Sequence, residues 1–214
     1  MGRAMALAGD HTELLEVLEQ ARSLGYLGPG PVEDHVRHGY GFVAAAGSDH
    51  RGRVIDLGSG GGVPGLILAS AWPEATVVLL DASERRTQFL TTAVRLLNLD
   101  PARVRVVRAR AEAVGRQDEW RRWSDLVVAR GFGRPALVAE CAAPLLVEGG
   151  RLIVSEPPEE RPGRWPQAGL DQLGLVSTAT VRHQGCWYQM LRQTGPCPDR
   201  FPRRPGIPAK RALF

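Results

Sequence analysis

The chain has 214 residues, of which 43% are hydrophobic, and its formal net charge is +4. This length and composition suit one α/β domain with a full core and short extensions. The three cysteines have no paired spacing and no apolar run reaches membrane-spanning length. We therefore expect a protein of the reducing cytoplasm, with no disulfide framework, no metal site and no membrane partner.

The excess positive charge lies at the end of the chain. From residue 194 onward there are four arginines and one lysine against one aspartate, so this segment accounts for the whole net charge. Its many prolines predict an extended conformation rather than a helix. We expect three parts: an N-terminal helical extension at 1–50, a central domain at 51–193 and a basic tail at 194–214.

Two helices are expected ahead of the central domain. Apolar residues at helical spacing predict the first over about 12–24, and a Gly-Pro-Gly-Pro run then breaks the chain. The second is expected from Val32 to about Ala46 and carries His35, Arg37 and His38. Taken alone, these three polar residues are typical of a solvated helix face. Both helices could wall one side of a ligand cleft.

The central domain begins with a strand that leads into a glycine-rich loop. The strand Val54–Leu57 is apolar apart from Asp56, and the loop runs from Gly58 to Gly62. Glycine lets the backbone bend freely and lets a ligand lie against bare peptide. Because a helical pattern follows, this unit predicts a nucleotide-like ligand at the carboxyl edge of a parallel sheet.

Two classes of cofactor compete for this loop. Asp56, Gly58, Gly60 and Gly62 form the pattern Asp-x-Gly-x-Gly-x-Gly, which is typical of methyltransferases that use S-adenosylmethionine (SAM). A dinucleotide fingerprint that starts where the strand ends would need a glycine at Val63. An acid near the loop also suits the sulfonium and ammonium groups of SAM better than a pyrophosphate. SAM is favoured, and NAD is the alternative.

Four more strands are expected to alternate with helices. The strand Thr76–Leu80 closes on Asp81, where an acid about 20 residues beyond the loop is placed to accept both ribose hydroxyls. The other expected elements are strands at Val104–Val107, Ser124–Ala129 and Arg151–Ser155, helices at 66–69, 83–97 and Pro135–Leu146, a short helix near Trp165–Leu173, and hairpin strands at Leu175–His183 and Trp187–Gln193. This layout predicts an α/β, Rossmann-like SAM-dependent methyltransferase fold: a seven-stranded, mostly parallel sheet with flanking helices.

Arg130 is the candidate catalytic residue. It follows the fourth strand, at the edge where catalytic groups of open α/β sheets collect. No Asn/Asp-Pro-Pro-Tyr/Phe or Pro-Cys motif occurs there, which argues against methylation of exocyclic amines and of pyrimidine C5. A ring nitrogen with a free lone pair needs no general base. For guanine N7, the Arg130 guanidinium could hold the neighbouring O6.

Several motifs together carry a resemblance to a known family. They are Val54–Leu68 with Val63-Pro64-Gly65, Leu80-Asp81-Ala82 followed by Arg85-Arg86 and Phe89-Leu90, Arg110-Ala111-Glu112, Ala129-Arg130-x-Phe132, Val36-Arg37-His38, and the basic ending Phe201–Arg211. From about Val32 onward the chain resembles the RsmG (GidB) family of bacterial 16S rRNA guanine-N7 methyltransferases. The resemblance implies a SAM-dependent enzyme that acts on small-subunit rRNA or a ribosomal precursor.

The resemblance also implies roles for individual residues. For SAM it implies contacts at Gly58, Val63, Ala111, Glu112 and Arg130, with Asp81 on the ribose; the loop residues Asp56, Ser59, Gly60 and Gly62 complete the candidate set. Arg37, His38 and the tail residues Arg203, Arg204 and Lys210 would face the RNA. A basic tail would attract phosphates, which gives salt-sensitive affinity rather than sequence reading.

One departure from the family bears on the acceptor. Just past the fifth strand, where a lysine is common, this chain has Ser155-Glu156-Pro157. Two further hypotheses stay open. One is an enzyme of the same fold with a different RNA or small-molecule acceptor, and the other is a non-catalytic factor that binds SAM or RNA.

Overall fold

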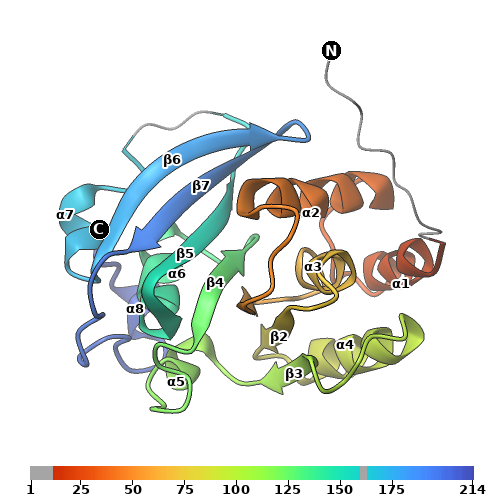
Figure 1. The fold of residues 1–214 in the computed structure, drawn as a ribbon, viewed down its shortest axis with the longest axis horizontal. Coiled ribbons are helices and arrows are strands. Elements are labelled where there is room, and N and C mark those ends of the chain that lie inside the picture. Colours follow the sequence, from red (N-terminus) through yellow and green to blue (C-terminus); the bar gives the residue numbers. More distant parts are fainter. Residues whose placement is uncertain (1–11, 160–162) are drawn as a thin grey trace.

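A seven-stranded sheet runs through the molecule in the order β3-β2-β1-β4-β5-β7-β6 (Figure 1). The computed structural model describes residues 12–159 and 163–214. Strands β1 to β5 are parallel, whereas β7 is antiparallel to both β5 and β6. The strands are β1 (Arg53–Leu57), β2 (Thr76–Asp81), β3 (Val104–Arg108), β4 (Ser124–Ala129), β5 (Leu146–Glu156), β6 (Leu175–His183) and β7 (Cys186–Gln193). This order confirms the predicted Rossmann-like sheet.

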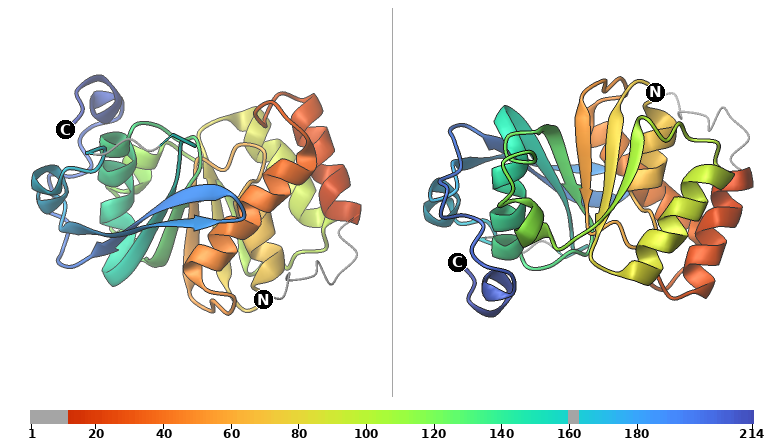
Figure 2. Two further views of the ribbon diagram at one scale, coloured as in Figure 1. Left: turned by 90° about the horizontal axis from the view of Figure 1, so that it is seen from above. Right: turned by 90° about the horizontal axis from the view of Figure 1, so that it is seen from below.

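Helices cover both faces of the sheet (Figure 2). One face carries α1 (Thr12–Ser23), α2 (Val32–Ala46), α3 (Gly65–Ala71) and α4 (Glu84–Leu96). The other carries α5 (Ala111–Val114), α6 (Pro135–Ala142), the 3-10 turn η1 (Ala143–Leu145), α7 (Gln167–Asp171) and α8 (Ile207–Lys210). Every helix in the part of the chain that the structure describes is too short or too polar to cross a membrane.

Burial of both faces explains why the strands read as continuous apolar runs. In β1, Val54 packs into the core on the α1–α4 side, whereas Ile55 and Leu57 pack into the core on the α5–α8 side. In β4, Leu126 and Val127 divide in the same way. Because successive side chains of a strand point to opposite faces, a central strand here needs apolar residues at almost every position.

The order of the strands reverses between β1 and β4. The chain passes from β1 outward to β2 and β3, and then crosses back to place β4 on the other side of β1. Ligands of open α/β sheets bind outside the carboxyl ends of the strands at such a switch point. Gly58 follows β1, Asp81 ends β2 and Arg130 follows β4, so the sequence-predicted site residues come together at this edge.

Two segments differ from their predicted structure. Strand β5 begins at Leu146 rather than Arg151, because the residues predicted to form a turn at 148–150 belong to the strand, beside an irregularity in its pairing with β4. The preceding α-helix ends at Ala142 rather than Leu146, since a 3-10 turn follows it. The tail was predicted to be extended, and this is wrong for α8, a short helix. The end of the tail also packs against the domain: a Cβ added to Gly169 in α7 would lie 2.1 Å from Cδ1 of Phe214.

Candidate active site

Asp56 holds the glycine loop against the start of α3. Its side chain is almost completely buried, and its Oδ2 accepts a hydrogen bond from the backbone N–H of Gly65 at 3.0 Å. The hydroxyl of Ser59 donates to the backbone oxygen of Asp56, also at 3.0 Å. Burial raises the pKa of Asp56 to about 7. Asp56 therefore fixes the conformation of the glycine loop from the buried side of the loop.

Asp81 ties the end of β2 to the same loop. One carboxylate oxygen accepts from the N–H of Gly60 at 2.9 Å, and the other accepts from the N–H of Ser83 at 2.8 Å. The Nη1 of Arg86 lies 3.7 Å from Oδ2. A carboxylate has about four acceptor positions, so Asp81 keeps capacity for further donors such as hydroxyls.

A pocket of about 310 Å³ opens at the ends of β1, β2 and β3; we call it the cofactor pocket. It is lined by Gly58, Leu80, Asp81, Ala82, Arg86, Ala109, Arg110, Ala111, Glu112, Gly131, Phe132, Leu137 and Ala209. Gly58 has a φ of +75°, and a Cβ there would lie 2.5 Å from Cδ2 of Phe132. Bare peptide, apolar walls and the Asp81 carboxylate fit the nucleoside part of SAM, with Asp81 for the ribose.

The predicted cofactor residues divide into two groups. Four of them line the cofactor pocket: Gly58, Asp81, Ala111 and Glu112. The others do not line it, namely Asp56, Ser59, Gly60, Gly62, Val63 and Arg130. Most of that second group builds the loop and the core beneath it, as the bonds of Asp56 illustrate. Their direct contact with SAM stays a prediction.

A second pocket, of about 360 Å³, lies at the ends of β4 and β5; we call it the acceptor pocket. Its lining residues are His38, Arg130, Gly131, Phe132, Gly133, Pro135, Val138, Val154, Ser155, Glu156, Pro157, Arg164 and Trp165. The turn Gly131-Phe132 belongs to both linings, so the two pockets adjoin there. One turn after β4 therefore contributes to the walls of both pockets.

Arg130 is held in the acceptor pocket by His35. The Nη2 of Arg130 bonds to Nδ1 of His35, and Nε2 of His35 bonds to the carbonyl oxygen of Gly28 at 3.1 Å. The Nη1 of Arg130 is buried and has no hydrogen-bond partner among residues 12–159 and 163–214. Burial lowers the pKa of Arg130, yet an arginine side chain stays protonated in proteins. Arg130 therefore offers a charged donor to a ligand.

His38 offers a second polar atom, whereas Arg37 does not. The ring of His38 stacks on Phe42 with centroids 6.0 Å apart, and its backbone oxygen accepts from Tyr188 Oη at 2.7 Å. Burial, and then the charge of Arg130, lower the pKa of His38 to about 4, so its ring is neutral at pH 7. Its Nε2 is buried without a partner in the described chain. Arg37 is exposed, and its Nη2 lies 2.6 Å from Oδ1 of Asp34.

Glu156 brings a cation into the acceptor pocket. Its Oε1 accepts from Trp165 Nε1 at 2.9 Å, and its Oε2 lies 2.6 Å from Nε of Arg164. Both partners line the acceptor pocket, on the segment that precedes α7. Glu156 is therefore paired with an arginine eight positions later in the chain. Nothing in the local sequence pattern predicts roles for Arg164 and Trp165.

The tail is bound to the domain through two buried glutamates. Arg203 donates to the carboxylate of Glu140 through its backbone N–H, Nε and Nη2, at 2.8, 2.8 and 2.6 Å, and Glu140 is wholly buried. The N–H of Gly206 donates to Oε1 of Glu112 at 3.0 Å, and Ala209 lines the cofactor pocket. The Arg203 guanidinium is thus engaged inside the protein, and its predicted RNA contact stays a prediction.

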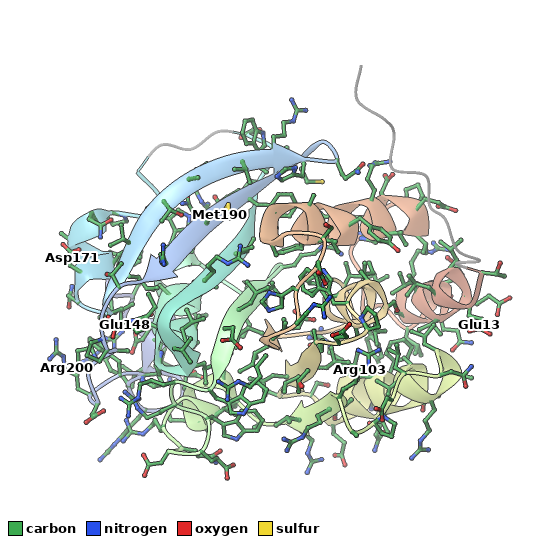
Figure 3. The ribbon with its side chains drawn as sticks, in the orientation of Figure 1. Glu13, Arg103, Glu148, Asp171, Met190 and Arg200 are labelled. Atoms are coloured by element: carbon green, nitrogen blue, oxygen red, sulfur yellow. The ribbon has the colours of Figure 1, made fainter. Side chains whose placement is uncertain are left out.

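The tail has an outer side that carries exposed cations. Arg204, Lys210 and Arg211 are exposed, as is Arg200 just before them. Figure 3 shows Arg200 at the opposite end of the molecule from Glu13 of α1. These positions leave the tail's outer side free to attract phosphates.

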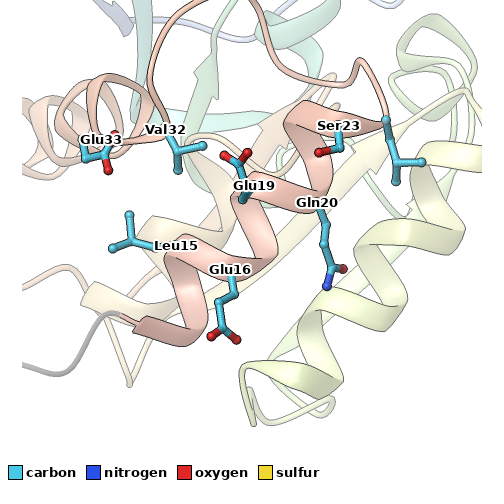
Figure 4. Close-up of a pocket in the computed structure, with 8 residues that line it drawn as sticks. Leu15, Glu16, Glu19, Gln20, Ser23, Val32 and Glu33 are labelled. Atoms are coloured by element: carbon cyan, nitrogen blue, oxygen red, sulfur yellow. The ribbon is translucent and has the colours of Figure 1, made fainter.

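A further groove lies away from the strand ends. It is a groove of about 760 Å³ between α1 and the start of α2 (Figure 4), with Glu16, Glu19 and Glu33 in its lining. Three acids would repel RNA phosphates.

Among the described residues, no group of three or more histidines, cysteines and acids could hold a metal ion.

The chain is similar in sequence to proteins of one family. A family model described as rRNA small subunit methyltransferase G (GidB) matches residues 37–156. The ribosomal RNA small subunit methyltransferase G of Thermotoga neapolitana is 41% identical over 171 residues, which span 77% of this chain and 72% of that protein. The protein of the same name from Prochlorococcus marinus strain MIT 9303 is 38% identical over 172 residues, spanning 75% and 68%.

A solved structure shares the fold. A SAM-dependent methyltransferase from Aquifex aeolicus matches with a TM-score of 0.59 at 16% identity, over 82% of this chain and 97% of that chain. At this identity the likeness concerns the fold, and it agrees with the sheet order described above.

Proposed function

Since the chain belongs to the family of rRNA small subunit methyltransferase G, we propose that it transfers the methyl group of SAM to N7 of a guanine in 16S rRNA. Its substrate would be the small ribosomal subunit or a precursor of it, and the enzyme would then act in the cytoplasm. Residues 51–193 would form the catalytic domain, with 1–50 and 194–214 as its extensions.

The observation that carries this proposal is the meeting of two pockets at the turn after β4. The cofactor pocket and the acceptor pocket share Gly131 and Phe132, so a donor in one and a base in the other would lie next to each other. When bound, SAM supplies a methyl group on a cationic sulfur that needs no further activation. The protein's task is then to align the nucleophile for in-line displacement.

Arg130 and His38 supply the alignment. With Nη2 engaged by His35, the Nη1 of Arg130 is left to donate to O6 of the guanine, next to N7. Guanine N7 has a free lone pair, so no side chain has to remove a proton. The neutral ring of His38 adds no positive charge beside a base that becomes cationic on methylation. The unpartnered Nε2 of His38 would bond to the RNA.

Trp165 provides an aromatic face for the base. Its indole is half-buried in the lining of the acceptor pocket, and the bond from Nε1 to Glu156 fixes its orientation. Proteins commonly hold an unstacked RNA base against such a ring. Arg164, fixed by the same carboxylate, would supply a cation for the RNA backbone beside that base.

The test is nucleoside analysis of 16S rRNA from strains with and without the gene. We expect 7-methylguanosine to disappear in the deletion strain, to return with the wild-type gene, and not to return with Arg130→Ala. Retention of the modified nucleoside in the deletion strain would reject the proposal.

A second candidate has the same chemistry but another RNA or a small molecule as acceptor. It is favoured by one observation, the acidic Glu156 in the lining of the acceptor pocket, where the resemblance to the family implies a lysine. Unmethylated small subunits from the deletion strain separate the two candidates, because only the first predicts methyl transfer to them. Transfer of a methyl group would also exclude a non-catalytic binding factor.

A further inference from the structure

The inner side of the tail contacts the domain, and its outer side is exposed to solvent. On its inner side, Arg203 and Gly206 bond to the buried carboxylates of Glu140 and Glu112, and Ala209 reaches the cofactor pocket. Glu112 itself lines that pocket, so one carboxylate both faces the ligand site and holds the tail. A segment tied at these points is a wall of the pocket.

We propose that the segment Arg203–Lys210 is a wall of the cofactor pocket that couples SAM binding to RNA binding. This inference rests on the proposed function, because it needs RNA as the second ligand. The docked segment presents Arg204 and Lys210 to solvent on the same few residues whose Ala209 lines the pocket. A phosphate bound on the outer side therefore stabilises the conformation in which the inner side closes the pocket.

The direction of the coupling follows from the two sets of contacts. A ligand in the pocket gains the contact with Ala209 only when the segment is docked. RNA meets Arg204 and Lys210 in a fixed arrangement only in the same state. Each ligand therefore prefers the docked state, and each must tighten the binding of the other by the same factor.

Buried anchors define the docked conformation that both ligands prefer. Glu140 is wholly buried, and among the ion pairs of the described chain its charge is matched by Arg203 alone. Arg121 adds hydrogen bonds from its guanidinium to the backbone oxygens of Phe201, at 2.8 Å, and Cys197, at 2.9 Å. RNA bound to Arg204 and Lys210 would add to these anchors and so raise the docked fraction that the cofactor prefers.

The first experiment tests the wall itself. In Ala209→Phe a bulky ring enters the cofactor pocket, and we expect the Kd for S-adenosylhomocysteine, measured by calorimetry, to rise at least about tenfold with an unchanged melting temperature. Ala102→Phe adds the same ring at an exposed position outside the pocket lining and should bind like the wild type. An unchanged Kd in Ala209→Phe would show that the segment does not bound the pocket and would overturn the inference.

The second experiment tests the coupling by equilibrium dialysis with labelled S-adenosylhomocysteine, which carries no transferable methyl group. Unmethylated small subunits are added at concentrations that saturate each variant, checked by co-sedimentation. We expect them to lower the Kd about fivefold or more in the wild type, in line with common coupling energies. The double variant Arg204→Gln/Lys210→Gln should lose this tightening and keep its Kd without RNA.

Arg22→Gln/Arg95→Gln is the matched control, because it removes the same charge from exposed residues of α1 and α4 and should keep the tightening. Equal tightening in both double variants, or none in the wild type, would overturn the coupling. Neither outcome depends on methyl transfer, so the proposed function stands or falls separately, on the nucleoside analysis of 16S rRNA.

Discussion

Nδ1 of His35 accepts a hydrogen bond from Nη2 of Arg130, which joins helix α2 to the turn after β4. The carbonyl oxygen of Gly28 can only accept, so the Nε2 that bonds to it carries the proton of the imidazole. Nδ1 is then free to accept, and the guanidinium is held with Nη1 left for the acceptor. His35 is a positioning residue that acts through Arg130.

Replacing His35 should slow methyl transfer without weakening SAM binding. A hydrogen bond to a charged group contributes about 1.5–3 kcal/mol, which corresponds to roughly a tenfold to hundredfold loss of rate if Arg130 is released. We expect His35→Ala to show this loss in single-turnover methylation of small subunits. His35→Asn, whose Oδ1 can take the place of Nδ1, should recover most of it. Equal rates in wild type and His35→Ala would contradict the assignment.

The buried Asp56 should make stability depend on pH. Its pKa of about 7 in the folded protein lies above the value of 3.8 expected when unfolded, so the folded state binds more protons between these values. The free energy of unfolding should therefore fall as the pH rises from about 4 to 7. Asp56→Asn keeps an acceptor for the N–H of Gly65 and removes the titration.

Denaturant unfolding at several pH values checks this prediction for Asp56. The wild type should lose stability between pH 5 and pH 8 by more than Asp56→Asn does. The same pH dependence in both proteins would show that Asp56 is ionised throughout.

Asp81 should decide whether SAM binds. Asp81→Asn loses one of the two acceptors for Gly60 and Ser83 and the charge that suits the ribose hydroxyls, and we expect the Kd for SAM to rise at least about tenfold. Asp81→Ala should abolish binding in calorimetry. Glu84→Gln is the control, because this neighbouring acid is exposed and pairs with Arg108 outside the pocket. Wild-type affinity in Asp81→Ala would reject the cofactor assignment.

Replacing Trp165 should weaken the binding of RNA and leave the binding of SAM unchanged. Stacking of a base on an aromatic ring contributes about 1–3 kcal/mol, so Trp165→Leu should raise the KM for small subunits roughly fivefold to a hundredfold. The Kd for SAM should not change, and Trp165→Phe should keep most of the affinity for the subunit. An unchanged KM in Trp165→Leu would reject the proposal that the base stacks on the Trp165 ring.

The architecture could be predicted from sequence because its determinants are local. Apolar runs such as Val54–Leu57 occur where strands are buried on both faces, and the glycines after them mark the turn into a helix. The bounds of β6 match the prediction because its alternating pattern ends at a Gln-Gly turn. The start of β5 was missed, since glycines at 149 and 150 are typical of a turn and their pairing depends on β4.

Residues that line the cofactor pocket were predictable when a motif fixed their place on a strand end. Asp81 and Gly58 belong to this class, and the structure brings them into one pocket. His35 and Trp165 were missed because their partners are distant in the chain and no local pattern marks them. Glu140 did carry a signal, as an acid within the otherwise apolar helix α6. A carboxylate buried in an apolar helix needs a cation beside it, and in the structure this cation is Arg203.

The packing of Phe214 against Gly169 has a practical consequence for handling the protein. A carboxyl-terminal affinity tag or fluorescent fusion would disturb the contact of Phe214 with α7. It would thereby loosen the segment that bounds the cofactor pocket and weaken ligand binding without unfolding the domain. Attachment to a biosensor surface through a cysteine introduced at Glu13 avoids this, because α1 lies at the far end of the molecule from the tail (Figure 3).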